Sequence, residues 1–273
     1  EAVSKLKSRL PEVLKAASKS PEEPEPYTLW GIALDKDFSD EKLNVLLVKF
    51  LRARDLNLDL ASKMLSDSIA WRKEFKADSI LDEEFDESVF GGVGYIHKTD
   101  KEGRPVCYNF YGELDQEAVF GDLQKFIRWR VQLMEKGVKL VDFVNVDTMV
   151  QIHDYKGVSM FGRTANSKQA TKEIIKIMQD NYPKFLSTKF FVNIPWWGSK
   201  IFKLIRPLLP EATVMLVNAR YSGMTLYIDF NANGLLLPYP AAIYYAPVPI
   251  GNREHYILTL LHSVTDTHHY QFL

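Results

Sequence analysis

The residues best suited to chemistry in this chain are a histidine and a tyrosine two positions apart, in the segment TMVQIHDY at 148–155. The alternation of a β-strand directs His153 and Tyr155 to one face, together with Met149 and Gln151. Residues two apart on a strand are separated by about 6.6 Å, which suits one metal ligand with a supporting neighbour better than two ligands of one ion. A tyrosinate is a hard anionic ligand of ferric haem, and an adjacent imidazole can accept or share its proton.

A simpler interpretation of His153 and Tyr155 stays open at this point. Most buried histidines and tyrosines are satisfied polar groups whose rings pack in the core. The hydroxyl would then bond to a carbonyl and the imidazole to an acid. The spacing of the two residues does not decide between a ligand site and a packed core.

Composition excludes several classes of protein. At 273 residues and 46% hydrophobic content, the chain can bury the core of one large domain or two modest ones. Its 34 basic and 35 acidic residues give no support for a broad nucleic-acid surface. The single cysteine, Cys107, cannot close an internal disulfide, so we expect a small core residue in a reducing, cytosolic setting. We expect no signal peptide at 1–10 and no membrane span in the proline-broken stretch 235–250.

Hydrophobic periodicity divides the chain into a helical part and an α/β part. The predicted helices of the first part span 1–19, interrupted at Pro11, 39–53 and 59–75. Past Phe90 the pattern predicts strands at 91–98, 105–112, 148–155 and 190–195, a helix at 122–136 stopped by Gly137, and a helix at 167–180. A strand, helix, strand order favours an α/β domain with at least one parallel pair of strands.

The stretch from Trp196 to Pro210, WWGSKIFKLIRPLLP, is the second informative segment. A wide apolar arc faces three basic residues, Lys200, Lys203 and Arg206, and two tryptophans begin the stretch. Such a helix is too short to cross a bilayer, but it suits the lipid interface or a lid over an apolar cavity. A core-packed amphipathic helix with a basic flank explains the pattern equally well.

Catalytic signatures are missing from the sequence. GVSMFG around Ser159 has one residue too many for the G-x-S-x-G elbow of hydrolases, and no zinc-type spacing of Cys and His occurs. Glycines 91, 92 and 94 precede a predicted strand, whereas a phosphate-binding loop opens a helix. We therefore expect a protein that is not an enzyme.

Five segments, in this order, resemble the CRAL-TRIO lipid-binding family, whose founding fungal members are phosphatidylinositol transfer proteins. They are KFLRARDLNLDLASKMLSDSIAWRKEF, GRPVCYNFYGEL, FIRWRVQLMEKG, MVQIHDYKGVS and NYPKFLSTKFFVNIPWW. The resemblance runs from about Leu43 to Val217. WRVQLMEKG together with QIHDYKGVS is similar to the fungal haem-binding branch of this family.

The resemblance implies a fold and a ligand. The implied fold is α/β, with an N-terminal helical lobe at 1–80 and a CRAL-TRIO domain at 85–250, followed by a divergent tail at 251–273. In that domain a mixed or parallel β-sheet floor lies under an apolar ligand cavity, closed by an amphipathic gate helix that matches Trp196 to Pro210. In the haem-binding branch the tyrosine of the HDY motif ligates the iron and its histidine lies beside it. This implies that Tyr155 is the axial ligand of haem b and that His153 is its neighbour.

Two positions depart from the family pattern. Arg54 stands where the haem-binding branch carries another pocket tyrosine. Lys184 reverses the charge of the glutamate that family members use, in a Y-P-E-x-L motif, to bind phosphatidylinositol. If both side chains point inward, they can pair with haem propionates.

Three functions therefore stay open. The first is a haem-binding protein with tyrosinate ligation, suited to stress response, haem storage or sensing. The second is a phosphatidylinositol or phospholipid transfer protein that regulates phosphoinositide signalling. The third, a haem oxidoreductase, lacks a visible acid/base residue. For either binding protein we expect transient membrane contact through Trp196 to Pro210, and a cytoplasmic location at the surface of endoplasmic reticulum or microsomal membranes.

Overall fold

The computed structural model describes residues 1–18, 26–159, 162–193, 226–229, 243–250 and 253–260. The chain divides into two compact units, Glu1–Phe230 and Asn231–Leu273. The domain boundaries predicted at 80, 85 and 250 stay predictions. The predicted gate helix at 196–210 lies outside the described residues.

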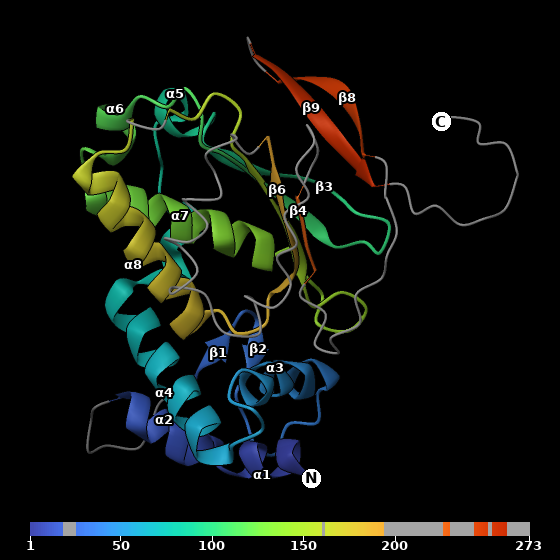
Figure 1. Cartoon of the computed structure of the whole chain (residues 1–273). Coiled ribbons are helices and arrows are strands. Elements are labelled where there is room, and N and C mark those ends of the chain that lie inside the picture. The colour runs from blue at the N-terminus through green and yellow to red at the C-terminus, as the bar shows by residue number, and fades with distance from the viewer. Residues whose placement is uncertain (19–25, 160–161, 194–225, 230–242, 251–252, 261–273) are drawn as a thin grey trace, which may run out of the picture. The chain divides into compact units, whose positions relative to one another are not determined.

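Four helices and a short hairpin form the N-terminal part of the first unit (Figure 1). They are α1 (Ala2–Ser8), α2 (Leu10–Ser18), the hairpin strands β1 (Thr28–Leu29) and β2 (Ile32–Ala33), α3 (Glu41–Arg52) and α4 (Leu58–Phe75). The side chains of Asp40 and Asn57 cap α3 and α4 by accepting from the backbone N–H groups of Lys42 and Leu60. The helices predicted over 1–19, 39–53 and 59–75 are confirmed.

A five-stranded mixed sheet forms the centre of the unit. Its strands, in spatial order, are β3 (Gly94–Thr99), β4 (Pro105–Phe110), β5 (Met149–Asp154), β6 (Leu186–Val192) and β7 (Leu226–Asp229). β5 pairs in parallel with both β4 and β6, and the outer pairs are antiparallel. The predicted mixed α/β class is confirmed. The strand predicted to begin at residue 190 begins four residues earlier, at Leu186. Its pairing with β5 includes the polar residues Ser187, Thr188 and Lys189 in the strand.

Two long helices, α7 (Leu123–Val138) and α8 (Ala165–Asn181), lie on one side of the sheet in Figure 1. Short helices complete this layer at Ala77–Asp82, α5 (Glu87–Phe90) and α6 (Gln116–Phe120). The prediction that Gly137 stops α7 is wrong, because Gly137 lies inside the helix. A Cβ atom there would lie 2.7 Å from Cε of Met149, so the glycine serves close packing of α7 on β5.

A buried ion pair joins the helical part to the sheet layer. Nη1 of Arg72 in α4 lies 2.6 Å from Oε1 of Glu135 in α7, and the two side chains are 2% and 7% exposed. The same carboxylate oxygen accepts hydrogen bonds from the hydroxyl of Tyr182 at 2.5 Å and from the indole of Trp30 at 3.3 Å. These residues lie in a continuous core with side chains from α1 to α4, α7 and β5. The helical part is therefore packed on the sheet layer.

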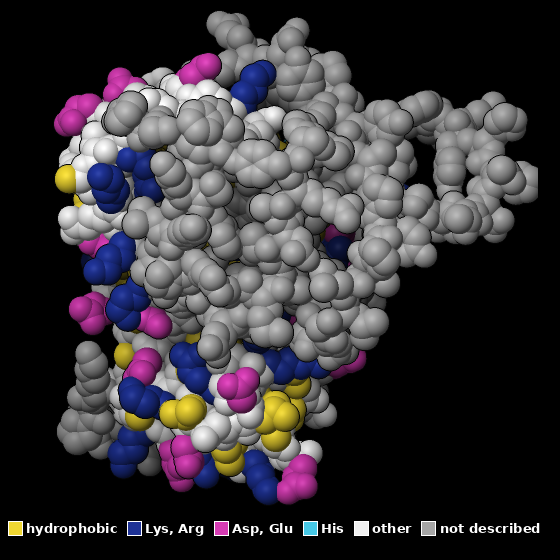
Figure 2. All heavy atoms as spheres, viewed as in Figure 1, with side chains coloured by type: hydrophobic (Ala, Val, Ile, Leu, Met, Phe, Trp, Pro, Cys, Tyr) yellow, Lys and Arg dark blue, Asp and Glu magenta, His cyan; other side chains and the backbone are white. Residues whose placement is uncertain are grey.

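The described residues of the second unit form an antiparallel pair of strands, β8 (Ile243–Ile250) and β9 (Arg253–Leu260). Where described side chains are visible on the face drawn in Figure 2, basic and acidic ones are interspersed, as the balanced composition predicts. None of the helices in the described part of the chain is long and apolar enough to cross a membrane.

The ion pair between Arg72 and Glu135 gives a test of the core. Glu135→Gln leaves the buried guanidinium without its nearest negative charge, so we expect the free energy of unfolding to fall by about 3 kcal/mol. Urea denaturation measures it. Glu84→Gln removes an exposed carboxylate of the same type and should change stability by less than about 0.5 kcal/mol. Equal stabilities of the two variants would contradict the assigned role.

Candidate functional site

The sheet face that packs toward α7 carries a row of polar side chains. In the parallel register, Asn109 lies opposite His153, and Gln151 lies between Cys107 and Lys189. Paired residues of adjacent strands project to the same face, so side chains from three strands meet there. We use the name polar cluster for seven residues: Asn109, Tyr111, Arg130, Gln151, His153, Tyr155 and Lys189.

His153 is the buried centre of the polar cluster. Its Nδ1 lies 2.7 Å from the hydroxyl of Tyr111, and its Nε2 lies 3.2 Å from Oε1 of Gln151. Burial, followed by the charges of Lys189 and Arg130, holds the pKa of His153 well below its usual value, so the imidazole is neutral. Oε1 of Gln151 only accepts, which places the ring proton on Nε2. Nδ1 then accepts a hydrogen bond from the phenol of Tyr111.

Tyr155 and Tyr111 stack at the carboxyl end of β5. Their ring centroids lie 4.9 Å apart at an interplanar angle of 28°, and the ring of Tyr111 is parallel to that of His153, at 5.8 Å. Burial raises the pKa of both phenols, although the charge of Arg163 acts in the opposite direction. Both hydroxyls are therefore protonated at neutral pH.

The backbone fixes Tyr111 beside β5. Its N–H donates to the carbonyl of Asp154 at 3.0 Å, which extends the pairing of β4 and β5 by one residue. At the next position, Gly112, a Cβ atom would lie 1.6 Å from the carbonyl oxygen of Lys156. Only glycine allows the two chain segments to approach this closely, and the stack of Tyr111 on Tyr155 depends on that approach.

Two cations lie within the polar cluster. Nη1 of Arg130, from α7, donates to Oδ1 of Asn109 at 2.6 Å. Lys189 projects from β6, and burial, followed by the charge of Arg130, lowers its pKa to about 8. The end of the sheet near Tyr155 is thus positively charged and rich in hydrogen-bond donors.

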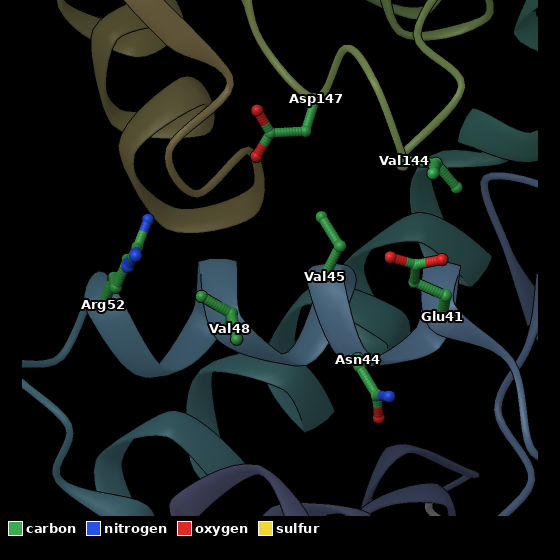
Figure 3. A pocket seen from close by; sticks show the side chains of 7 residues that line it. All are labelled: Glu41, Asn44, Val45, Val48, Arg52, Val144 and Asp147. Carbon is green, nitrogen blue, oxygen red and sulfur yellow. The ribbon is translucent and has the colours of Figure 1, made fainter.

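Two cavities formed by described residues lie elsewhere in the unit. One, of about 460 Å³, lies between α3 and the loop before β5 (Figure 3). Its lining includes Glu41 and Arg52 from the helix and Val144 and Asp147 from the loop. The other, of about 620 Å³, is lined by residues of α4 and α7 and of the segment between them. Neither cavity is lined by a residue of the polar cluster.

Comparison with known proteins assigns the family. The family described as "CRAL/TRIO domain" matches residues 90–229, and "CRAL/TRIO, N-terminal domain" matches residues 3–67. The chain belongs to the CRAL/TRIO family. The expected resemblance is confirmed, and the polar cluster lies within the CRAL/TRIO domain.

Similar proteins come from plants and fungi. Patellin-6 of Arabidopsis thaliana is 39% identical over 196 residues, which cover 68% of this chain and 46% of patellin-6. The chain therefore spans about half the length of this relative. "Phosphatidylinositol transfer protein SFH5" of Candida albicans is 39% identical over 236 residues, covering 78% of this chain and 72% of that protein. A solved structure, "Crystal structure of Sfh5", matches with a TM-score of 0.67 and 31% identity, over 77% of this chain and 75% of that one.

The other two residues predicted for a CRAL/TRIO ligand site lie away from the polar cluster. Lys184 is exposed, and its carbonyl accepts from Nζ of Lys49 at 3.1 Å. It precedes β6 at the end where Leu186 pairs with Met149. Tyr155 lies six residues along β5 from Met149, or about 20 Å. Arg54 follows α3, the helix that carries Lys49, and its guanidinium donates to the carbonyl of Ala53 at 2.8 Å. The structure does not bring Arg54 and Lys184 together with His153 and Tyr155.

The donor chemistry of the polar cluster suits Tyr155, the residue predicted to be the axial iron ligand. Both ring nitrogens of His153 are hydrogen-bonded to protein side chains, so the imidazole is not placed as an iron ligand. Tyr155 retains the chemistry of a single tyrosinate ligand, and nearby arginines suit propionate carboxylates. Within the described ranges, no three residues of the types His, Cys, Asp and Glu are grouped to hold a metal ion.

Four residues of the polar cluster are not among those that the sequence pattern predicts for the site: Asn109, Tyr111, Arg130 and Lys189. Alternation along PVCYNFYG carries a signal for Tyr111, since it places that residue on the same face as Cys107 and Asn109. Lys189 is a lone cation before an apolar run. Its partners depend on the strand register, which the sequence does not specify.

The lowered pKa of Lys189 predicts a pH effect on stability. The unfolded chain holds this proton up to about pH 10.4, whereas the folded chain releases it near 8, so stability should rise with pH between these values. Lys189→Met should lose this rise and should be more stable than the wild type at pH 7, by roughly 1 to 3 kcal/mol. Urea denaturation at pH 7 and pH 10 measures both effects. Lys184→Met, which removes an exposed lysine, should retain the rise; an unchanged rise in Lys189→Met would contradict the assignment.

Proposed function

We propose that this chain binds one phospholipid within the CRAL/TRIO domain, with the lipid head group against the polar cluster, and carries it between membranes. The supporting observation concerns Tyr111, Tyr155 and Lys189. Each of these side chains has some solvent-accessible surface, although burial by the surrounding protein is the largest cause of its pKa shift. Side chains that are accessible but surrounded by protein are expected to line an internal recess.

The chemistry of this recess suits a lipid head group. The phenol of Tyr155, the amide of Gln151 and the two cations are all hydrogen-bond donors. Phosphate oxygens are acceptors, and acyl chains would lie along the apolar residues of the domain. The fungal relative named a phosphatidylinositol transfer protein supports a transfer function. Such a function requires no acid/base catalysis, and we propose a binding protein, not an enzyme.

Membrane contact and location are part of the same proposal. A transfer protein must touch a bilayer to exchange its ligand, and the tryptophans and basic residues of 196–210 suit the lipid interface. We propose that the protein acts in the cytoplasm, at the surface of endoplasmic reticulum membranes. The charge reversal at Lys184 counts against the inositol-binding mode of the family. The head group is therefore to be identified by comparing lipids in the transfer experiment.

Lipid transfer is directly measurable. Purified protein should move labelled phosphatidylinositol or phosphatidylcholine from donor to acceptor vesicles above a protein-free blank. Native mass spectrometry of the same sample should show one lipid per chain. Absence of both transfer and bound lipid would overturn the proposal.

Haem is a second candidate ligand, favoured by Tyr155 in its stack with Tyr111. When bound, haem would supply a ferric centre to which the Tyr155 phenolate can coordinate. The cost of removing the proton of Tyr155, whose pKa is raised by burial, would have to be offset by the iron.

Absorption spectroscopy tests the haem proposal. Protein expressed with ample haem should be coloured, with a Soret band that is lost in Tyr155→Phe and retained in Tyr95→Phe. Tyr95 is a matched control because it lies on β3 and stacks with Tyr108, on the other face of the sheet. A colourless wild-type protein would exclude haem and leave the lipid proposal in place.

A further inference from the structure

The cations of the polar cluster differ from the two buried cations, Lys49 and Arg72, in the part of the chain that the structure describes. Lys49 lies 2.9 Å from Oδ2 of Asp147. Arg72 lies between Glu135 and Asp78, at 2.6 and 2.7 Å. Lys189 and Arg130 are half-buried and have no carboxylate within ion-pair distance among the described residues. Within those residues, the two buried cations are thus paired with acids, whereas the two cations of the polar cluster are not.

We infer that the group held against Lys189 and Arg130 is an anion, and that these two residues form the anion-binding subsite of the ligand recess. This inference rests on the proposed function and specifies its ligand class. Removing an unpaired charge from water is unfavourable, and two adjacent cations add their mutual repulsion. A phosphate or carboxylate between them removes both costs.

Neighbouring groups do not supply the missing negative charge. Cys107 lies on the same sheet face as Lys189, with Gln151 between them. Burial raises the pKa of the Cys107 thiol, which therefore stays protonated. His153 is neutral, and the phenols of Tyr111 and Tyr155 are protonated. Asn109 and Gln151 are uncharged amides. All titratable groups that the cluster places around the two cations are therefore neutral, and the site carries a net positive charge.

The geometry provides contacts for an anion as well as charge. Arg130 is oriented by its 2.6 Å hydrogen bond to Asn109, which leaves other guanidinium N–H groups for a ligand. Lys189 is only half-buried, so its ammonium group is accessible from the recess. A net negative charge is carried by the phosphate of an acidic phospholipid and by the carboxylate of a fatty acid. In phosphatidylcholine the choline cation cancels the charge of the phosphate, so this lipid brings no net negative charge to a site with two cations.

The test compares lipid selection by single variants. Wild type, Lys189→Met, Lys189→Arg and Lys184→Met are each incubated with phosphatidylcholine vesicles that contain phosphatidic acid or oleate, and bound lipid is quantified by native mass spectrometry. We expect wild type to favour one anionic lipid over phosphatidylcholine. Lys189→Met should reduce that preference by about tenfold or more, because it removes a charge-assisted hydrogen bond. Lys189→Arg and Lys184→Met should retain the preference.

The outcomes separate this inference from the proposed function. Enrichment of phosphatidic acid identifies a phosphate head group, and enrichment of oleate identifies a carboxylate. If Lys189→Met still loads phosphatidylcholine but has lost the anionic preference, both proposals stand. If all variants load lipid with the same preference, or the wild type favours phosphatidylcholine, the anion subsite is overturned while lipid binding stands. If no protein loads lipid although thermal melting shows it folded, the proposed function fails.

Discussion

A buried positive charge needs a negative partner, and this requirement organises the first unit of the protein. Arg72 forms an ion pair with Glu135, and the carboxylate of Glu135 also accepts hydrogen bonds from Tyr182 and Trp30. These four residues come from α4, α7, the segment after α8 and the hairpin β1–β2. One ion pair thereby fixes the helical part of the chain against the layer that covers the sheet. Because both charges are removed from water, the arrangement is stable only when every partner is in place.

The sheet register is the second constraint. Parallel pairing of β4, β5 and β6 aligns Cys107, Gln151 and Lys189 in one row and Asn109 with His153 in the next. α7 adds Arg130 over these rows. Polar side chains gather on the face where a sheet and helix normally bury apolar ones, so packing alone does not account for the residues of this face. A ligand recess explains why the protein tolerates the cost.

The polar cluster also bears on the choice between lipid and haem. Both ring nitrogens of His153 are hydrogen-bonded, one to Tyr111 and one to Gln151, so the imidazole orients the phenol of Tyr111. Tyr155 is the one residue of the predicted pair whose chemistry still suits iron. Donors and cations dominate the cluster, and they suit phosphate or carboxylate oxygens from either kind of ligand. An acidic lipid as the proposed ligand agrees with this donor chemistry and with the family assignment.

The amino-acid sequence by itself determined the helices of the first 75 residues, an α/β domain with at least one parallel pair of strands, and the shared face of His153 and Tyr155. These features follow from local periodicity and from the order of the elements. The mixed sheet was implied by the family resemblance. Tertiary structure alone decided which side chains surround that pair. Tyr111 lies 42 positions before His153, and Lys189 and Arg130 come from other elements. It also separated Arg54 and Lys184 from the cluster by the length of a strand, since register and helix packing depend on contacts between distant segments, which local sequence patterns do not specify.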